Sequence, residues 1–181
     1  LTMPHLALNG WFIDQPHTGT GQYLQHLLNH LPAVAPDFQV SLVAPTAALA
    51  GAQLPAEIQA VPIASGQGAL AKVRFEQQLF PAACRTIKAD LAHVPHWATP
   101  LGSPIPVVTT IHDLIPLLMP EHRGKWQVQL YTALVTAAAK GSTHIITVSE
   151  AARRDVLQYL KLPAERVTAV LQGVDESFNA A

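Results

Sequence analysis

The stretch VVTTIHD, from Val107 to Asp113, ends an apolar, β-branched run with an imidazole and a carboxylate. Such a run is typical of a strand buried on both faces of a sheet. Ligand-binding groups collect at the carboxyl ends of parallel strands, where His112 and Asp113 fall. We therefore predict a functional role for His112, with Asp113 orienting the following loop. The alternative is a structural histidine whose ring nitrogens are satisfied by backbone groups.

A second candidate site is the sequence Gly19-Thr20-Gly21, between an expected first strand and a helical pattern. Glycines at this point let the backbone approach a ligand closely, and the helix amino terminus behind them favours anions. We predict a loop beside a phosphate-bearing ligand, with His17 and Gln22 as neighbouring polar contacts. Because the full GxGxxG spacing is missing, an ordinary turn is the alternative. Tyr23 is predicted to lie in the core.

Two further candidate sites follow other expected strands. His96 and Trp97 lie on a loop where they would either stack on a ligand and line its pocket or serve plain packing. Ser149 is suited to cap a helix, and the same helix end could meet a phosphate or another polar ligand group. His93 and His96 are three residues apart, but Pro95 between them argues against a shared helical face, so we expect no metal site.

Composition limits the functional classes. The chain has 181 residues, a formal net charge of -1 and 11 Lys and Arg residues, which argues against nucleic-acid binding. The single cysteine, Cys84, has no partner for an internal disulfide, and we expect it to be buried in a protein of the cytoplasm. No apolar run reaches the roughly 18 residues that a membrane span requires.

The elements that must position these side chains alternate between strand and helix patterns. We predict an α/β fold with a Rossmann-like, doubly wound, mainly parallel sheet flanked by helices. The expected strands are Leu6–Ile13, Phe38–Ala44, Glu57–Ile63, Asp90–His93, Val107–Asp113, Thr143–Val148 and Arg166–Leu171. The expected helices are Gln22–Leu31, Leu70–Thr86 with a kink or interruption at Pro81, Arg123–Lys140 with an apolar face of Trp126, Leu130, Leu134 and Ala138, and a last helix from Ser149 to about Leu160.

Several motifs occur in an order that resembles a known family. They are Gly19-Thr20-Gly21 with Tyr23 and Leu27-Leu28, Asp90-Leu91-Ala92-His93, Thr110-Ile111-His112-Asp113-Leu114 with Pro116, Ile146-Thr147-Val148-Ser149 with Asp155, and Gly173-Val174-Asp175. Together they resemble the amino-terminal half of a family four retaining glycosyltransferase of the GT-B fold. The resemblance implies that residues 1–172 form an acceptor-side domain and that residues 173–181 begin an interdomain linker. It further implies a carboxyl-terminal, donor-binding domain that is absent here.

The resemblance also implies an activity. The enzyme would transfer a sugar from a nucleoside diphosphate sugar to a hydroxyl of a glycan or lipid-linked acceptor, as in polysaccharide biosynthesis, and this domain would be inactive alone. His112 would lie beside the reacting sugar as the catalytic residue, and Gly19 to Gly21 would approach the donor phosphates. The acceptor would contact His17, Gln22, His96, Trp97, Asp113 and Ser149. Nucleotide sugar, acceptor and the second domain are the expected partners, and no metal or other cofactor is expected.

We expect a cytoplasmic protein, with peripheral contact at the inner face of the membrane left open by the basic set Lys72, Arg74, Arg85 and Lys88. Two other functions stay open. One is half of a sugar-nucleotide epimerase of the same fold, and the other is a non-catalytic module that binds a glycan or a partner. A dehydrogenase is disfavoured, because the second expected strand ends in Val43-Ala44-Pro45 without the acidic residue that binds the ribose.

Overall fold

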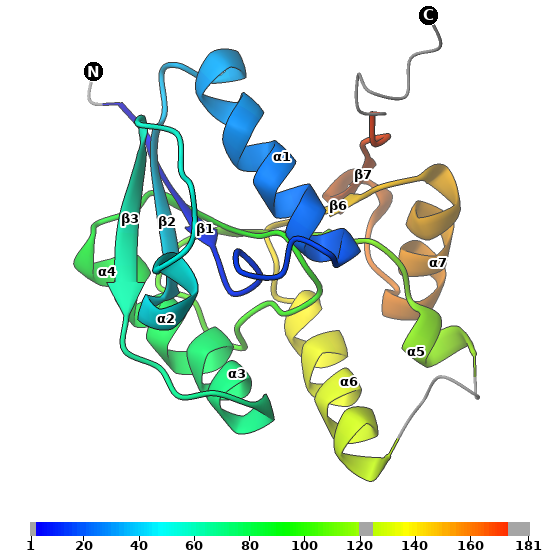
Figure 1. Cartoon of the computed structure of the whole chain (residues 1–181). Coiled ribbons are helices and arrows are strands. Elements are labelled where there is room, and N and C mark those ends of the chain that lie inside the picture. Colours follow the sequence, from blue (N-terminus) through cyan, green and yellow to red (C-terminus); the bar gives the residue numbers. More distant parts are fainter. Residues whose placement is uncertain (1–2, 120–124, 174–181) are drawn as a thin grey trace, which may run out of the picture.

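Seven parallel strands form one sheet in the order β3-β2-β1-β4-β5-β6-β7 (Figure 1). The computed structural model describes residues 3–119 and 125–173. The strands are β1 His5–Asn9, β2 Gln39–Pro45, β3 Ile58–Ile63, β4 Leu91–Val94, β5 Val107–Ile111, β6 His144–Thr147 and β7 Val167–Ala169. Each neighbouring pair of these strands is parallel, which confirms the predicted doubly wound, Rossmann-like fold class.

Helices connect the strands and cover the sheet. They are α1 Gly19–Val34, α2 Thr46–Leu49, α3 Ala69–Arg74, the π-helical segment η1 Phe75–Leu79, α4 Phe80–Thr86, α5 Ile115–Leu118, α6 Trp126–Ala139, α7 Glu150–Leu160 and the short 3₁₀ turn η3 Ala164–Arg166. In the part of the chain that the structure describes, no helix is both long and apolar enough to cross a membrane.

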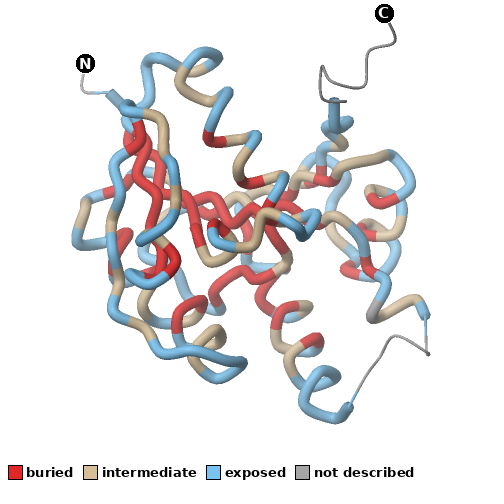
Figure 2. Tube along the Cα trace, viewed as in Figure 1, coloured by how far each residue is buried: buried red, intermediate tan, exposed pale blue. Residues whose placement is uncertain are grey.

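The two faces of the sheet carry separate cores, because successive strand residues point to opposite sides. On β1, Leu8 packs against Leu24 of α1, whereas Ala7 packs with Phe80 and Cys84 of α4. Figure 2 shows the buried residues concentrated along the central strands. Cys84 is buried as predicted, and burial raises the pKa of its thiol to about 12.

The chain order of the strands reverses between β1 and β4. From β1 the chain runs outward to β3 and then returns to β4 on the other side of β1. The loops that follow β1 and β4 therefore diverge at the carboxyl edge of the sheet, and a crevice at such a point is where doubly wound folds bind ligands. This topology positions the loop with His96, which follows β4, and His112, which follows the neighbouring β5.

Two boundaries near the amino terminus differ from the prediction. The first strand ends at Asn9 rather than Ile13, because the Asn9 side chain accepts a hydrogen bond from Trp11 N at 3.0 Å and starts a turn. Helix α1 begins at Gly19 rather than Gln22, and it continues through Pro32 to Val34. Pro32 removes one helical hydrogen bond close to the helix end, and the Ala35 N–H still closes the last turn on Leu31 O at 2.9 Å.

Two helical predictions also need correction. The segment Leu70–Thr86 stays helical, and its irregularity is the π segment η1, which ends before Pro81; Pro81 lies in the first turn of α4, which begins at Phe80. Residues 123–124 of the helix expected from Arg123 lie outside the described residues, and α6 starts at Trp126. Its predicted apolar face is wrong at the start: Trp126 is 68% exposed and Leu130 64%. The buried positions are instead Thr132, Val135, Ala138 and Ala139.

Candidate functional site at the carboxyl edge of the sheet

His112 follows directly on the last residue of β5, at the carboxyl edge of the sheet. Its Nε2 lies 3.1 Å from the carbonyl oxygen of Pro95, on the loop after β4. A carbonyl only accepts hydrogen bonds, so Nε2 is the donor in this contact, and in the neutral tautomer with that proton the lone pair is on Nδ1. The contact holds the half-buried imidazole in one orientation.

Tyr23 of α1 lies against this imidazole, although its position was predicted to be core. Its half-buried ring meets the His112 ring edge to face, with centroids 4.9 Å apart. The Tyr23 hydroxyl lies 3.3 Å from Thr110 Oγ1, and His93 Nε2 lies 2.9 Å from the same oxygen. These contacts connect α1, β4 and β5 beneath His112.

Three histidines near this edge influence one another electrostatically. Burial, together with the smaller electrostatic effects of His96 and His112, lowers the pKa of His93 to about 4. Burial also lowers the pKa of His96, although Glu76 opposes the shift through a hydrogen bond and its charge. His93 and His96 are therefore neutral at physiological pH. The sequence analysis gave His93 no role other than rejecting it as a metal ligand.

The structure places His96 and Trp97 on the loop after β4, beside the site. His96 is 5% exposed, its Nε2 lies 3.3 Å from Glu76 Oε1, and its ring packs edge to face on Phe12. Trp97 is half-buried and packs against two hydrophobic clusters, one that contains Ile111 and one that contains Phe80 and Cys84. Glu76 was missed from the sequence. Its signal was a carboxylate four residues after Lys72 in an expected helix, a spacing that places the two side chains next to each other.

The sequence Gly19-Thr20-Gly21 was predicted to be a loop, but it forms the first turn of α1. Thr18 caps this helix by accepting the Gly21 N–H at 3.0 Å. A side chain on Gly21 would place its Cβ 1.9 Å from the carbonyl oxygen of Gln15, so this glycine is required by packing. A Cβ on Gly19 would meet no atom of the described residues within 4 Å. Gly19 therefore presents open backbone at the helix end.

The remaining predicted site residues are not grouped around His112 but lie near the starts of α1, α5 and α7. His17 and Gln22 are exposed around the start of α1. Asp113 accepts the Ile115 N–H at 2.9 Å, which orients the start of α5 as predicted. Ser149 caps α7 by accepting the Ala152 N–H at 3.1 Å, and it lies at the carboxyl edge of β6. Of the basic set considered for lipid contact, Lys72 instead pairs with Glu76 at 3.0 Å.

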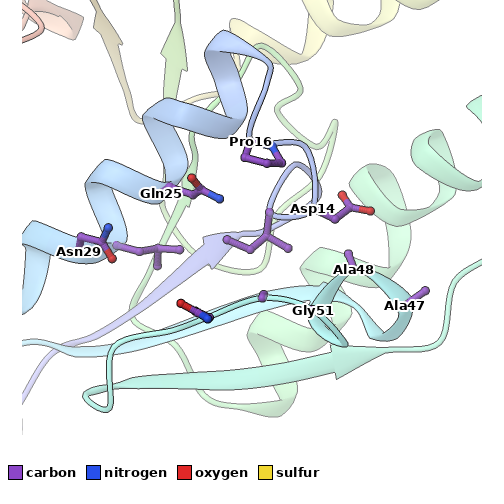
Figure 3. A pocket seen from close by; sticks show the side chains of 11 residues that line it. Asp14, Pro16, Gln25, Asn29, Ala47, Ala48 and Gly51 are labelled. Atoms are coloured by element: carbon purple, nitrogen blue, oxygen red, sulfur yellow. The ribbon is translucent and has the colours of Figure 1, made fainter. Parts of the chain in front are cut away.

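A cavity of about 530 Å³ lies apart from these residues, between the loop after β1, α1 and α2 (Figure 3). Asp14, Gln25 and Asn29 are among its lining residues, whereas His112, His96 and Trp97 are not. Over residues 3–119 and 125–173, no group of three or more His, Cys, Asp or Glu side chains is placed to hold a metal ion. The expectation of a metal-independent enzyme stays a prediction.

Comparison with solved structures shows that the chain shares its fold with one half of several GT-B proteins. A sucrose-phosphate synthase from Thermosynechococcus elongatus superposes with a TM-score of 0.66 at 12% identity, over 95% of this chain and 49% of that one. A glycosyltransferase from Rickettsia africae gives a TM-score of 0.53 at 9% identity, over 97% and 44%. An Anabaena protein solved in complex with UDP and glucose gives 0.57 at 15%, over 95% and 45%. The chain thus spans just under half the length of each.

At these identities the shared property is the fold, that of one half of a GT-B enzyme. A search of curated protein sequences gave no significant match. The sequence profile named Glycosyltransferase Family 4, in contrast, matches residues 17–178, which is most of the chain and includes each predicted site residue. The chain therefore belongs to glycosyltransferase family 4.

Proposed function

We propose that this chain is the acceptor-side domain of a retaining glycosyltransferase, which transfers a sugar from a nucleoside diphosphate sugar to a hydroxyl of a glycan or lipid-linked acceptor. The observation that carries the proposal is His112, because its Nε2–H is fixed by Pro95 and its Nδ1 is left as an acceptor at the carboxyl edge of the sheet. Family membership supplies the reaction class. The Anabaena structure, solved with UDP and glucose, supports a sugar nucleotide as the donor.

In the proposed reaction the bond between the sugar carbon and the diphosphate oxygen breaks, and the acceptor oxygen forms the new bond to the same carbon. With retention of configuration, the departing phosphate oxygen takes the acceptor proton. His112 then need not act as the base. Its Nδ1 accepts a hydrogen bond from a hydroxyl of the reacting sugar and holds that sugar in position, which lowers the barrier by orientation.

The start of α1 is the proposed approach to the donor phosphates. Gly19 leaves open backbone there, and the amino end of a 16-residue helix favours negative charge. Thr20 lies in the same turn, with His17, Gln22 and Ser149 as outer contacts. Asp113 contributes by orienting the loop after His112.

The second half of the GT-B fold supplies most of the donor site in this proposal. We therefore expect the acceptor-side domain to be inactive by itself, although its sheet and covering helices are those of a complete Rossmann-like unit. Val174 and Asp175, expected at the crossing between the two halves, lie outside the described residues.

Product analysis tests this proposal. The full-length protein would be incubated with UDP-, GDP- or ADP-sugars labelled in the sugar, together with methyl hexosides or a polyprenyl phosphate sugar as probe acceptors. We expect a labelled glycoside with the anomeric configuration of the donor. An epimerised nucleotide sugar would establish the epimerase instead, an inverted glycoside would contradict retention, and glycan binding without turnover would favour the non-catalytic module.

A further inference from the structure

A buried ionic cluster lies beside the proposed acceptor loop. We define the Glu76 cluster as Lys72, Glu76, His96 and Tyr131. Glu76 is 0% exposed, and its Oε1 lies 3.0 Å from Lys72 Nζ and 3.3 Å from His96 Nε2. The Tyr131 hydroxyl donates to Glu76 Oε2 at 3.0 Å and accepts from Lys72 Nζ at 2.7 Å. The carboxylate thus has a donor on each of its oxygens.

Packing alone does not explain this cluster. Glu76 stands in η1 between Phe75 and the apolar start of α4, where an apolar side chain would fill the same space. Removing a carboxylate and an ammonium from water is costly, and buried pairs of this kind are often no more stable than an apolar replacement. The chain brings α3, α6 and the loop after β4 to one carboxylate on η1. A charge retained there is suited to orient a neighbour.

The hydrogen bonds determine the state of that neighbour. Lys72 neutralises the charge of Glu76, and an ionised carboxylate only accepts hydrogen bonds. His96 must therefore carry its proton on Nε2, which leaves the lone pair of the neutral ring on Nδ1. His96 Nδ1 is buried and has no hydrogen-bond partner among the described residues. The Nε1–H of the adjacent Trp97 is likewise buried and unpartnered within that part of the chain.

A buried acceptor and a buried donor on adjacent residues would both be satisfied by a partner that accepts as well as donates hydrogen bonds. A sugar ring does so, because each hydroxyl both donates and accepts. The Glu76 cluster does not present a free positive charge to a ligand, because the Lys72 ammonium is already paired with Glu76 and also faces the rings of Tyr131 and Phe12. An anionic group would find no donor at His96 Nδ1.

We propose that Glu76 is a positioning residue, which holds His96 as its Nε2–H tautomer so that Nδ1 receives a hydroxyl of an uncharged part of the acceptor sugar. This inference rests on the proposed function and adds the kind of group that the acceptor presents beside His96. Trp97 Nε1–H donates to an oxygen of the same sugar.

The tautomer can be read directly by ¹⁵N NMR of the full-length protein labelled in histidine. The signals of His96 are assigned by their loss in His96→Gln. We expect an unprotonated Nδ1 and a protonated Nε2 in the unsubstituted protein. In Glu76→Gln, where three donors meet an amide that also carries N–H groups, we expect a mixture of tautomers. A wild-type Nδ1–H tautomer, a doubly protonated ring or an unchanged state in Glu76→Gln would overturn the proposal.

Kinetics then test whether Glu76 acts through His96. With the acceptor probe that supports transfer in the product assay, Glu76→Gln and His96→Gln should each raise the acceptor KM by about tenfold while the donor KM stays within about twofold. The double variant should be no worse than the poorer single variant, because both changes remove one interaction. Glu150→Gln, at an exposed carboxylate 3.9 Å from Arg153, is the control and should leave both constants unchanged.

Independent, multiplying effects of the two substitutions would contradict a role exerted through His96. If Glu76→Gln does not fold, two results still test the proposal. They are the tautomer of His96 in the wild-type spectrum and the effect of His96→Gln on the acceptor KM compared with the donor KM. The two readouts also separate the claims. Absence of transfer by the full-length protein would defeat the proposed function while the spectrum still reports the tautomer. Transfer together with an Nδ1–H tautomer would defeat this inference alone.

Discussion

The ring of Tyr23 meets the ring of His112 edge to face, with centroids 4.9 Å apart and ring planes at 87°. This contact joins the first helix to the end of β5, and the Tyr23 hydroxyl adds a 3.3 Å contact to Thr110 on the same strand. Together with the hydrogen bond to Pro95, it holds the His112 imidazole from two sides. The orientation of His112 therefore depends on two residues that are remote from it in sequence.

The two parts of Tyr23 should contribute differently. Tyr23→Phe keeps the ring and loses the hydroxyl, so we expect a loss of about 1 kcal/mol in the free energy of unfolding with activity nearly intact. Tyr23→Ala removes the ring and frees the imidazole, so kcat/KM should fall by about tenfold or more beyond any loss of folded protein. Urea unfolding and initial rates would measure both. Equal activity of the Phe and Ala variants would argue against positioning by the ring.

The glycines at the start of α1 form a matched pair. Gly21→Ala places a Cβ against the Gln15 carbonyl oxygen and should destabilise the fold by about 1–3 kcal/mol. Gly19→Ala enters open space at a helix end and should change stability by less than about 1 kcal/mol. If Gly19 approaches the donor, its alanine variant should nevertheless raise the donor KM. Denaturant unfolding and donor kinetics test the pair, and an unaffected donor KM in Gly19→Ala would remove Gly19 from the proposed donor site.

Acid should destabilise the fold through His93. Burial lowers its pKa from 6.5 to about 4 in the folded state, so the unfolded chain binds a proton first as the pH falls. Above about pH 6.5 this linkage has no effect, and as the pH falls toward 4 it lowers the free energy of unfolding by roughly 3 kcal/mol in total. Unfolding free energies across this window should be less steep in His93→Gln than in the exposed control His30→Gln. Identical slopes would contradict the prediction.

Transfer should not require a divalent cation. In the proposed enzyme, a fixed basic side chain of the second domain would stabilise the departing diphosphate without a metal. The full-length protein should keep its rate in excess EDTA. A loss of activity on chelation that returns with Mg²⁺ or Mn²⁺ would show that a metal takes part.

The fold class could be predicted because each strand carried its own local signal. The apolar runs at Leu6, Val40 and Val107 and the helix cap at Ser149 are short-range patterns, and the structure confirms the elements they indicated. The predicted ends of strands and helices were wrong where a single side chain or a neighbouring segment determined them. Asn9 ends β1 through its own side chain, and α1 continues past Pro32 because the proline removes only one hydrogen bond close to the helix end.

The candidate site was predictable only in part. His112 could be found because a strand pattern stops at it, and His96 because it follows another strand. Tyr23 and Glu76 could not be assigned in the same way, because their partners are distant in the chain: Thr110 is 87 residues from Tyr23, and Tyr131 is 55 from Glu76. The helical spacing that suggested core for Tyr23 does not tell which edge of the sheet the helix crosses.

The most direct test of the account compares sugar transfer by the full-length protein, its His112→Ala variant and the matched variant His144→Ala. His144 begins β6 at the opposite edge of the sheet and contacts Thr168, so it controls for loss of a histidine in the same fold. We predict retained-configuration transfer by the parent and the His144 variant, and a fall of about 100-fold or more in kcat/KM for His112→Ala with unfolding behaviour unchanged. Near-parental transfer by a folded His112→Ala protein would contradict the central claim.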